Sequence, residues 1–226
     1  MRLLKILSLA IFVISFLQAQ MNMPKNYRAV PFNKAEILQS GETKMFCPKC
    51  GMTLPMFYRT NHAAKVNGKM QQFCSIHCLV EAMNQDGNVT DIQVVDNSTL
   101  KFIPVSKAYY VVGSSKPGTM SKVSKYAFGT QEAAQKFAKE YGGKVMKFDD
   151  VLAMVKDSFK KESSMIAKKQ KMMAKKGEMI YNKKCQKIDK KFNSVAEAKA
   201  YIKSSKACGD IKGKPLQAVG LYLIHR

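Results

Sequence analysis

Four cysteines in the first half of the sequence are spaced as two pairs that suit a single metal ion. The spacing is C-x2-C-x23-C-x3-C, and the residues are Cys47, Cys50, Cys74 and Cys78. Each pair fits one short turn, and a fold that brings two such turns together makes a four-sulfur site. The sequence therefore predicts one constellation of thiol ligands.

A methionine follows the second cysteine after a single glycine. Gly51 lets the backbone turn so that the Cys50 thiolate and the Met52 thioether point to the same place. A thiolate beside a thioether is a soft donor set, which favours Cu(I) over Mg²⁺, Ca²⁺ or Mn²⁺. Zn(II) prefers thiolate and imidazole and gains little from methionine. The expected metal is Cu(I), with Zn(II) as the alternative.

Other uses of these side chains stay open. Six cysteines in an exported chain can form disulfides, and the segment 47–50 has the spacing of a thiol–disulfide oxidoreductase motif. However, Cys74 and Cys78 bracket a helix start and are poorly placed to bond to each other. His77 lies in the same helical turn and is either a further ligand or a neighbouring group. No other acid–base or nucleophile arrangement is visible, so we expect a protein that is not an enzyme.

The N-terminal residues have the pattern of a secretory signal peptide. Arg2 and Lys5 precede an apolar run that is too short to span a membrane, and a cleavage site follows Ala19. We therefore expect a periplasmic protein. The net charge of +22 fits an acidic protein partner or a peripheral contact through a basic helix. Nucleic acid is not an expected partner, because an exported chain rarely meets it and the lysines lack interleaved aromatics.

The hydrophobic pattern after the first cysteine pair predicts alternating strands and helices. Residues 62–66 and 69–73 are expected to form a hairpin around Asn67-Gly68 and to lead into a helix capped by Ser75. Further strands are expected at 91–95, 100–105, 108–112, 124–128 and 144–148, with a helix after Thr130 and a lysine-rich helix at 151–176 capped by Asp149. The expected fold class is α+β, with two related strand–strand–helix–strand units followed by the lysine-rich helix and a small all-α unit.

This pattern divides the chain into five segments. They are a signal peptide (1–19), a lead-in segment (20–44), a metal-binding domain (45–155), a basic helical linker (156–176) and a small helical unit (177–226). In the last unit we expect a Cys185–Cys208 disulfide, because a unit of this size needs a cross-link. Its first and last helices resemble those of a c-type cytochrome, but the Cys-x-x-Cys-His motif is absent and haem is not expected. The methionines of the lysine-rich helix are expected to fill packing gaps.

Segments of the metal-binding domain also occur in a recognisable order. They are Cys50-Gly51-Met52, 64–68 leading into Phe73, 110–113, Met120, 126–128, 132–138, 142–145 and Phe148-Asp149. Together these segments resemble the NosL family, accessory proteins of nitrous-oxide reductase, over about half the chain. The resemblance implies a Cu(I) site with Cys50, Met52 and Met120 as ligands. It also implies a copper-receiving partner, which is nitrous-oxide reductase or its assembly machinery. The chain departs from the family pattern in lacking a lipid-anchor cysteine, in its extra cysteines and in its long C-terminal extension.

Overall fold

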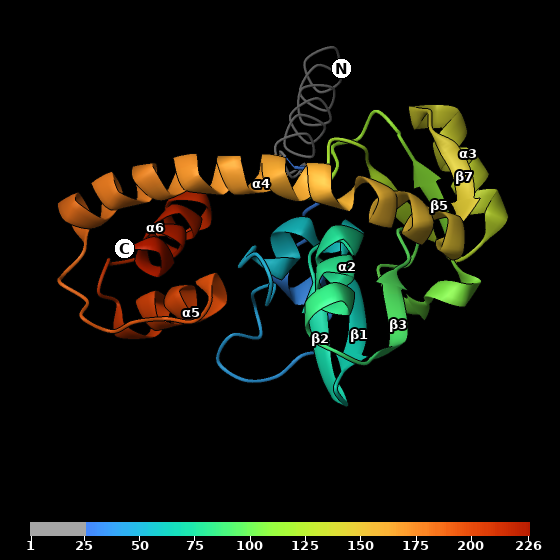
Figure 1. The fold of residues 1–226 in the computed structure, drawn as a ribbon. Coiled ribbons are helices and arrows are strands. Elements are labelled where there is room, and N and C mark those ends of the chain that lie inside the picture. Colours follow the sequence, from blue (N-terminus) through green and yellow to red (C-terminus); the bar gives the residue numbers. More distant parts are fainter. Residues whose placement is uncertain (1–25) are drawn as a thin grey trace, which may run out of the picture.

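The computed structural model describes residues 26–226, which form an α+β protein (Figure 1). The predicted signal peptide, with Met21 and Met23 of the lead-in segment, lies outside these residues. Before the first cysteine pair, the described chain is irregular except for a short 3-10 turn at Phe32–Lys34. Within the described range, none of the helices has the length and apolarity needed to cross a membrane.

The first unit is a four-stranded antiparallel sheet with one helix. Its elements are the 3-10 segment Leu54–Thr60, β1 (His62–Val66), β2 (Lys69–Phe73), α2 (Ile76–Gln85), β3 (Val89–Val95) and the short β4 (Phe102–Pro104). The strand order is β2-β1-β3-β4. Asn67 and Gly68 have φ values of 48° and 79°, as the predicted β1–β2 hairpin requires.

The second unit repeats the same order of elements. It comprises β5 (Tyr109–Val112), β6 (Lys125–Phe128), α3 (Gln131–Tyr141) and β7 (Lys144–Lys147). The strand order is β6-β5-β7, so the first strand is central here, as β1 is between β2 and β3. Thr130 caps α3 by accepting a hydrogen bond from the amide of Ala133. The prediction of two related strand–strand–helix–strand units is confirmed.

A single long helix, α4 (Phe148–Lys184), links these units to the C-terminal part of the chain. Figure 1 shows α4 passing over the sheets at one end and over α6 at the other. It is longer than predicted because its buried residues continue past 176, with Val155 in the first core and Tyr181 in the second. The expected boundary between residues 176 and 177 therefore falls inside a continuous helix.

Of the predicted caps at Asp149 and Ser75, only the one at Ser75 is the N-cap in the structure. The N-cap of α4 is Lys147, and Asp149 lies in the first turn, where its carboxylate still meets the positive end of the helix dipole. Ser75 is the N-cap of α2, but its side chain makes no capping hydrogen bond. The Ser75 hydroxyl instead lies 4.0 Å from the sulfur of Cys74.

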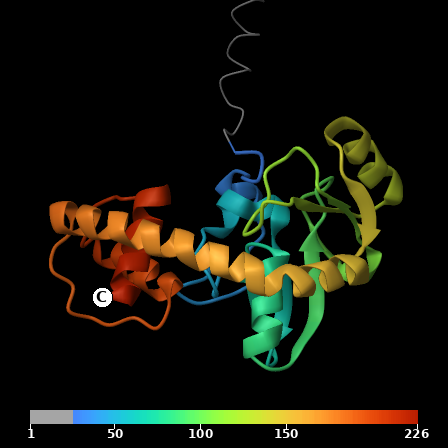
Figure 2. The same ribbon diagram turned by 45° about the horizontal axis from the view of Figure 1, so that its top comes forward.

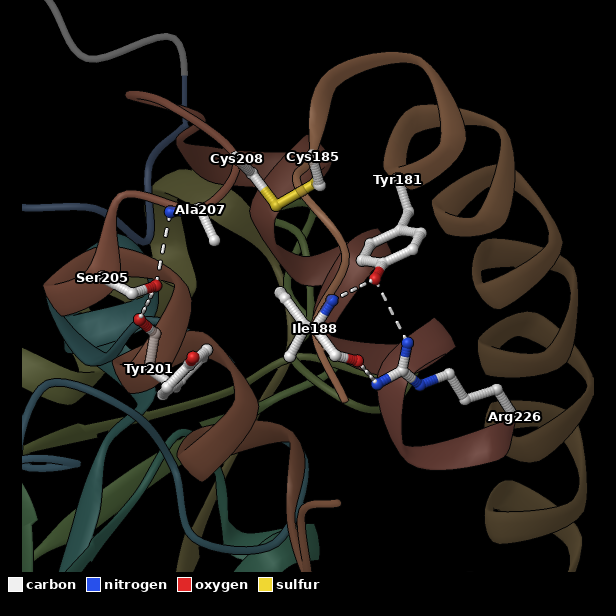
Figure 3. The surroundings of a disulfide bond; sticks show 8 residues. All are labelled: Tyr181, Cys185, Ile188, Tyr201, Ser205, Ala207, Cys208 and Arg226. Atoms are coloured by element: carbon white, nitrogen blue, oxygen red, sulfur yellow. Dashed lines mark hydrogen bonds between the residues drawn. A yellow bond between two sulfur atoms is a disulfide. The ribbon is translucent and has the colours of Figure 1, made fainter. Parts of the chain in front are cut away.

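The C-terminal unit is helical, as predicted, and packs on the end of α4. It consists of α5 (Val195–Ser205) and α6 (Gly213–His225), the red helices of Figure 2. α4 and α6 cross so closely at Gly177 that a Cβ there would overlap the carbonyl of Ala218. The predicted Cys185–Cys208 disulfide is present (Figure 3).

Hydrogen bonds at the end of α4 also hold the C-terminal helical unit in place. The amide of Ile188 donates to the Tyr181 hydroxyl at 2.7 Å, and Arg226 donates both to that hydroxyl and to the Ile188 carbonyl (Figure 3). The C-terminus is thereby tied to the segment that follows α4.

Candidate metal centre

The structure brings the four predicted cysteine ligands into one cluster. The sulfur atoms of Cys47, Cys50, Cys74 and Cys78 all lie within 4.8 Å of one another, and all four side chains are buried. The Cys50–Cys74 sulfur distance is 3.4 Å and the Cys74–Cys78 distance is 3.7 Å. All four are free thiols. The cluster can therefore act as one multidentate soft ligand.

The first cysteine pair lies on a tight turn closed by two backbone hydrogen bonds. The amide of Cys47 donates to the carbonyl of Met52, and the amide of Gly51 donates to the carbonyl of Cys47, both at 2.8 Å. Gly51 has φ +71°, a left-handed conformation that costs a glycine little. The turn thereby points the sulfurs of Cys47 and Cys50 into the cluster.

The second pair lies where β2 meets α2. Cys74 follows the last residue of β2, and its carbonyl accepts a hydrogen bond from the Thr60 hydroxyl at 2.9 Å. Cys78 is the third residue of α2, in the turn where the helix dipole favours a negative sulfur. A strand end and a helix start therefore hold these two thiols in place.

Hydrogen bonds between the thiols concentrate negative charge on one sulfur. Burial opposes ionisation at Cys47, but hydrogen bonds from the other three thiols outweigh it and hold the pKa of Cys47 well below its usual range. Burial, together with hydrogen bonds to Cys47 and Cys50, raises the pKa of Cys74 well above its usual range. Hydrogen bonds to the same two sulfurs, followed by burial, raise the pKa of Cys78. A bound cation would displace the remaining protons.

Met52 and Met120, the two predicted thioether ligands, lie on the same cavity as Cys50. This inner cavity has a volume of about 260 Å³. Met120 lies on the 114–122 loop with φ +56°. Arg28 holds the loop by donating to the carbonyl of Gly118 at 2.6 Å, and the hydroxyls of Thr60 and Thr119 are hydrogen-bonded to each other at 2.8 Å. The structure thus brings a thiol and two thioethers to one cavity.

His77, the remaining predicted ligand, is directed toward α4. Its ring stacks on Phe159 with centroids 4.8 Å apart, and its Nδ1 lies 3.5 Å from an oxygen of Glu162. Burial raises the pKa of Glu162, but hydrogen bonds from His77 and Ser121 and the charge of Lys125 outweigh burial and lower it. His77 is therefore placed to position α4 against α2, apart from the four sulfurs.

The C-terminal unit contacts the cysteine turn directly, a contact that no sequence pattern indicated. Lys199 of α5 is 1% exposed and donates to the carbonyl of Gly51 and, at 2.8 Å, to Gln217 of α6. Gln217 in turn donates to the carbonyl of Cys50 at 2.8 Å. Burial lowers the pKa of Lys199 to about 7, and the charges of Cys50 and Cys47 oppose this shift.

Two methionines of α4 also line the inner cavity, where packing alone was expected. They are Met165 and Met173. They lie eight residues apart, and α4 also carries the exposed Met172 and Met179. Spacing along the helix therefore did not distinguish the methionines that face the cavity from those that face solvent.

Comparisons with known proteins identify the family of the chain. Among solved structures, the chain matches one described as the crystal structure of the copper chaperone NosL from Shewanella denitrificans. The identity is 26%, the match covers 50% of this chain and 95% of that chain, and the TM-score is 0.39. No curated protein matches the chain. The NosL family model matches residues 39–155, more than half of the 226 residues. The chain belongs to the NosL family.

Proposed function

We propose that the protein is a Cu(I) chaperone of the periplasm. It binds Cu(I) as cargo and delivers it to a copper-receiving metalloprotein, nitrous-oxide reductase or its assembly machinery, without catalysing a reaction itself. Family membership supports the link to copper. The observation that carries the proposal is that Cys50 belongs both to the buried thiol cluster and to the lining of a cavity that also contains Met52 and Met120.

Donor chemistry and access both favour transferable Cu(I) at this site. Thiolates and thioethers are the ligands that select Cu(I) among common biological metals. Cys47, Cys74 and Cys78 are enclosed, whereas Cys50 opens onto the inner cavity. An incoming donor can therefore reach the metal from the side of Cys50, with Met52 and Met120 as neighbouring thioether ligands.

The test is Cu(I) competition against a soft chelator, with the reduced chain under anaerobic conditions. We expect Cys50→Ser to abolish competition for the tightly held equivalent, because the thiol that belongs both to the cluster and to the cavity lining is lost. Cys185 and Cys208 lie in a separate disulfide, so a Cys185→Ser/Cys208→Ser variant is a control for the loss of cysteine as such. Unchanged copper affinity in Cys50→Ser contradicts the proposal.

A structural zinc site is the second candidate function. The observation that favours it is the spacing of the sulfurs, 3.4 and 3.7 Å. A tetrahedral site with zinc–sulfur bonds of about 2.3 Å requires sulfur–sulfur distances of about 3.8 Å. In that case the cluster holds Zn(II) permanently and stabilises a binding module. Metal analysis of protein purified anaerobically from the periplasm separates the two functions, since a chaperone should carry copper and a structural site should carry one zinc per chain.

A further inference from the structure

The inner cavity is lined by more thioethers than the family resemblance requires. Four methionine side chains line it together with Cys50: Met52, Met120, Met165 and Met173. The last two come from α4, beyond the end of the family match at residue 155. The C-terminal extension therefore supplies half of the thioethers around this cavity.

Packing alone does not account for these two methionines. A methionine used as a gap filler removes empty space, whereas the cavity beside Met165 and Met173 retains about 260 Å³. The same helix carries Met172 and Met179, which are 62% and 65% exposed. An open cavity bordered by flexible thioethers is the kind of space that admits a soft metal ion.

A second, outer cavity adjoins the inner one. It has a volume of about 800 Å³, and Met52 and Met173 line both cavities. These two methionines therefore stand between the thiol cluster and the outer cavity. The charged residues in the lining of the outer cavity are all basic: Arg28, Lys116, Lys199 and Lys214. The inner cavity is also net basic, with Arg28, Lys122 and Lys169 against Glu162, so positive charge opposes a free cation in both cavities. Copper is therefore favoured there only through direct bonds to soft donor atoms.

We propose that Met165 and Met173, together with Met52 and Met120, make the inner cavity a second Cu(I) site, through which the ion passes between Cys50 and the outer cavity. The proposal rests on the proposed function in taking Cu(I) as the cargo. Thioethers are neutral soft donors that bind Cu(I) and contribute little to Zn(II) sites. Because they carry no charge, they hold the ion less tightly than thiolates do, as a transfer position requires.

The experiment is anaerobic Cu(I) titration of the full chain from residue 20 against a graded soft chelator, with the four cluster thiols reduced and the Cys185–Cys208 disulfide intact. We expect wild type to bind two equivalents and to release the second at the lower chelator concentration. Met165→Leu/Met173→Leu should lose that weaker equivalent and keep the tight one. The matched control is Met172→Leu/Met179→Leu, the same double change at exposed positions of the same helix, which should still bind two.

X-ray absorption at the copper edge of selenomethionine-labelled protein identifies the donors directly. We expect selenium neighbours of copper at the first equivalent, from Met52 and Met120, and more of them after the second equivalent is added. Met165→Leu/Met173→Leu should lose that increase. Two equivalents in that variant, or no selenium near copper in doubly loaded wild type, overturns the proposal. Circular dichroism of each variant shows that leucine has not changed the fold.

The same titration separates this proposal from the proposed function. If the four cysteines retain zinc while one Cu(I) still depends on Met165 and Met173, the cavity site stands and the thiol cluster is not the copper site. If Cys50→Ser loses the tight equivalent while the methionine variant binds as wild type does, the thiol site stands and the cavity site is overturned.

Discussion

Lys199 of α5 donates a hydrogen bond from Nζ to the carbonyl oxygen of Gly51, which lies between two proposed copper ligands. The ammonium group also lies 4.3 Å from the centre of the Phe46 ring and bonds to Gln217. A buried cation is stable only when hydrogen bonds and charges replace its water. Residues far apart in sequence thus fix the turn that carries Cys50.

Lys199→Met should therefore destabilise the protein by removing the hydrogen bonds that hold the turn carrying Cys50. The substitution keeps much of the side-chain length but leaves the Gly51 carbonyl and the Gln217 oxygen without their donor, at a cost of about 2 kcal/mol in the free energy of unfolding. Urea unfolding measures the effect. Lys203→Met, at an exposed position of α5, is the control and should change stability little. Equal stabilities of the two variants would show that the Lys199 contacts contribute nothing.

Gly51→Ala should be harmful for two separable reasons. Its left-handed φ costs an alanine about 1 kcal/mol, and a Cβ at this position would overlap Val195. Val195→Gly in the same chain removes both side-chain atoms that this Cβ would meet, Cγ1 and Cβ, but leaves the backbone strain at position 51. A double-mutant cycle should show that Val195→Gly recovers at least about 1 kcal/mol of the loss. Simple additivity of the two changes would contradict the contact.

Met52→Leu and Met120→Leu should each weaken Cu(I) binding without unfolding the protein. Loss of one thioether ligand lowers affinity by about tenfold, or about 1.4 kcal/mol. Chelator competition measures the affinity. For Met120, an X-ray absorption spectrum with the same sulfur count in wild type and variant would exclude it as a ligand.

The reduced, metal-free chain from residue 20 should keep its helical circular dichroism spectrum. Both strand–helix units and the C-terminal unit bury cores of their own, so metal binding adds stability only by mass action. A site that creates the fold behaves differently, because its binding energy is folding energy. A random-coil spectrum after chelation would favour the structural zinc interpretation.

Stability should also fall in mild acid because of His62. This histidine is fully buried between the Thr60 carbonyl and the Tyr110 hydroxyl, and burial lowers its pKa from 6.5 to about 4. Above pH 6.5 the side chain is neutral in both states, and its contribution is complete. As the pH falls from 6.5 to 4, the unfolded chain binds a proton that the folded chain does not, so up to about 3 kcal/mol is lost. Denaturant unfolding at pH 7 and 4.5 should show this loss, and His62→Gln should show less of it.

Local patterns predicted the elements that local chemistry determines. Each of three features depends on a few neighbouring residues: the Asn67-Gly68 turn, the helix start after Thr130 and the spacing within each cysteine pair. The corresponding elements appear close to where they were expected. The extent of α4 was underestimated because its second half is stabilised by α6, which is distant in sequence. The burial of Lys199 was unpredictable for the same reason. A lysine in a lysine-rich chain gives no sign that one copy is enclosed.

The two sulfur sites take their residues from parts of the chain that are synthesised at different times. The thiol cluster takes all four sulfurs from the segment between Cys47 and Cys78, whereas the inner cavity also takes lining residues from α4 and α6, among them Met173 and Leu221. A growing chain therefore completes its tightest soft-metal ligand well before the enclosure that controls access to it. Until those helices are added, the four thiols lack the enclosure that α4 and the C-terminal unit provide.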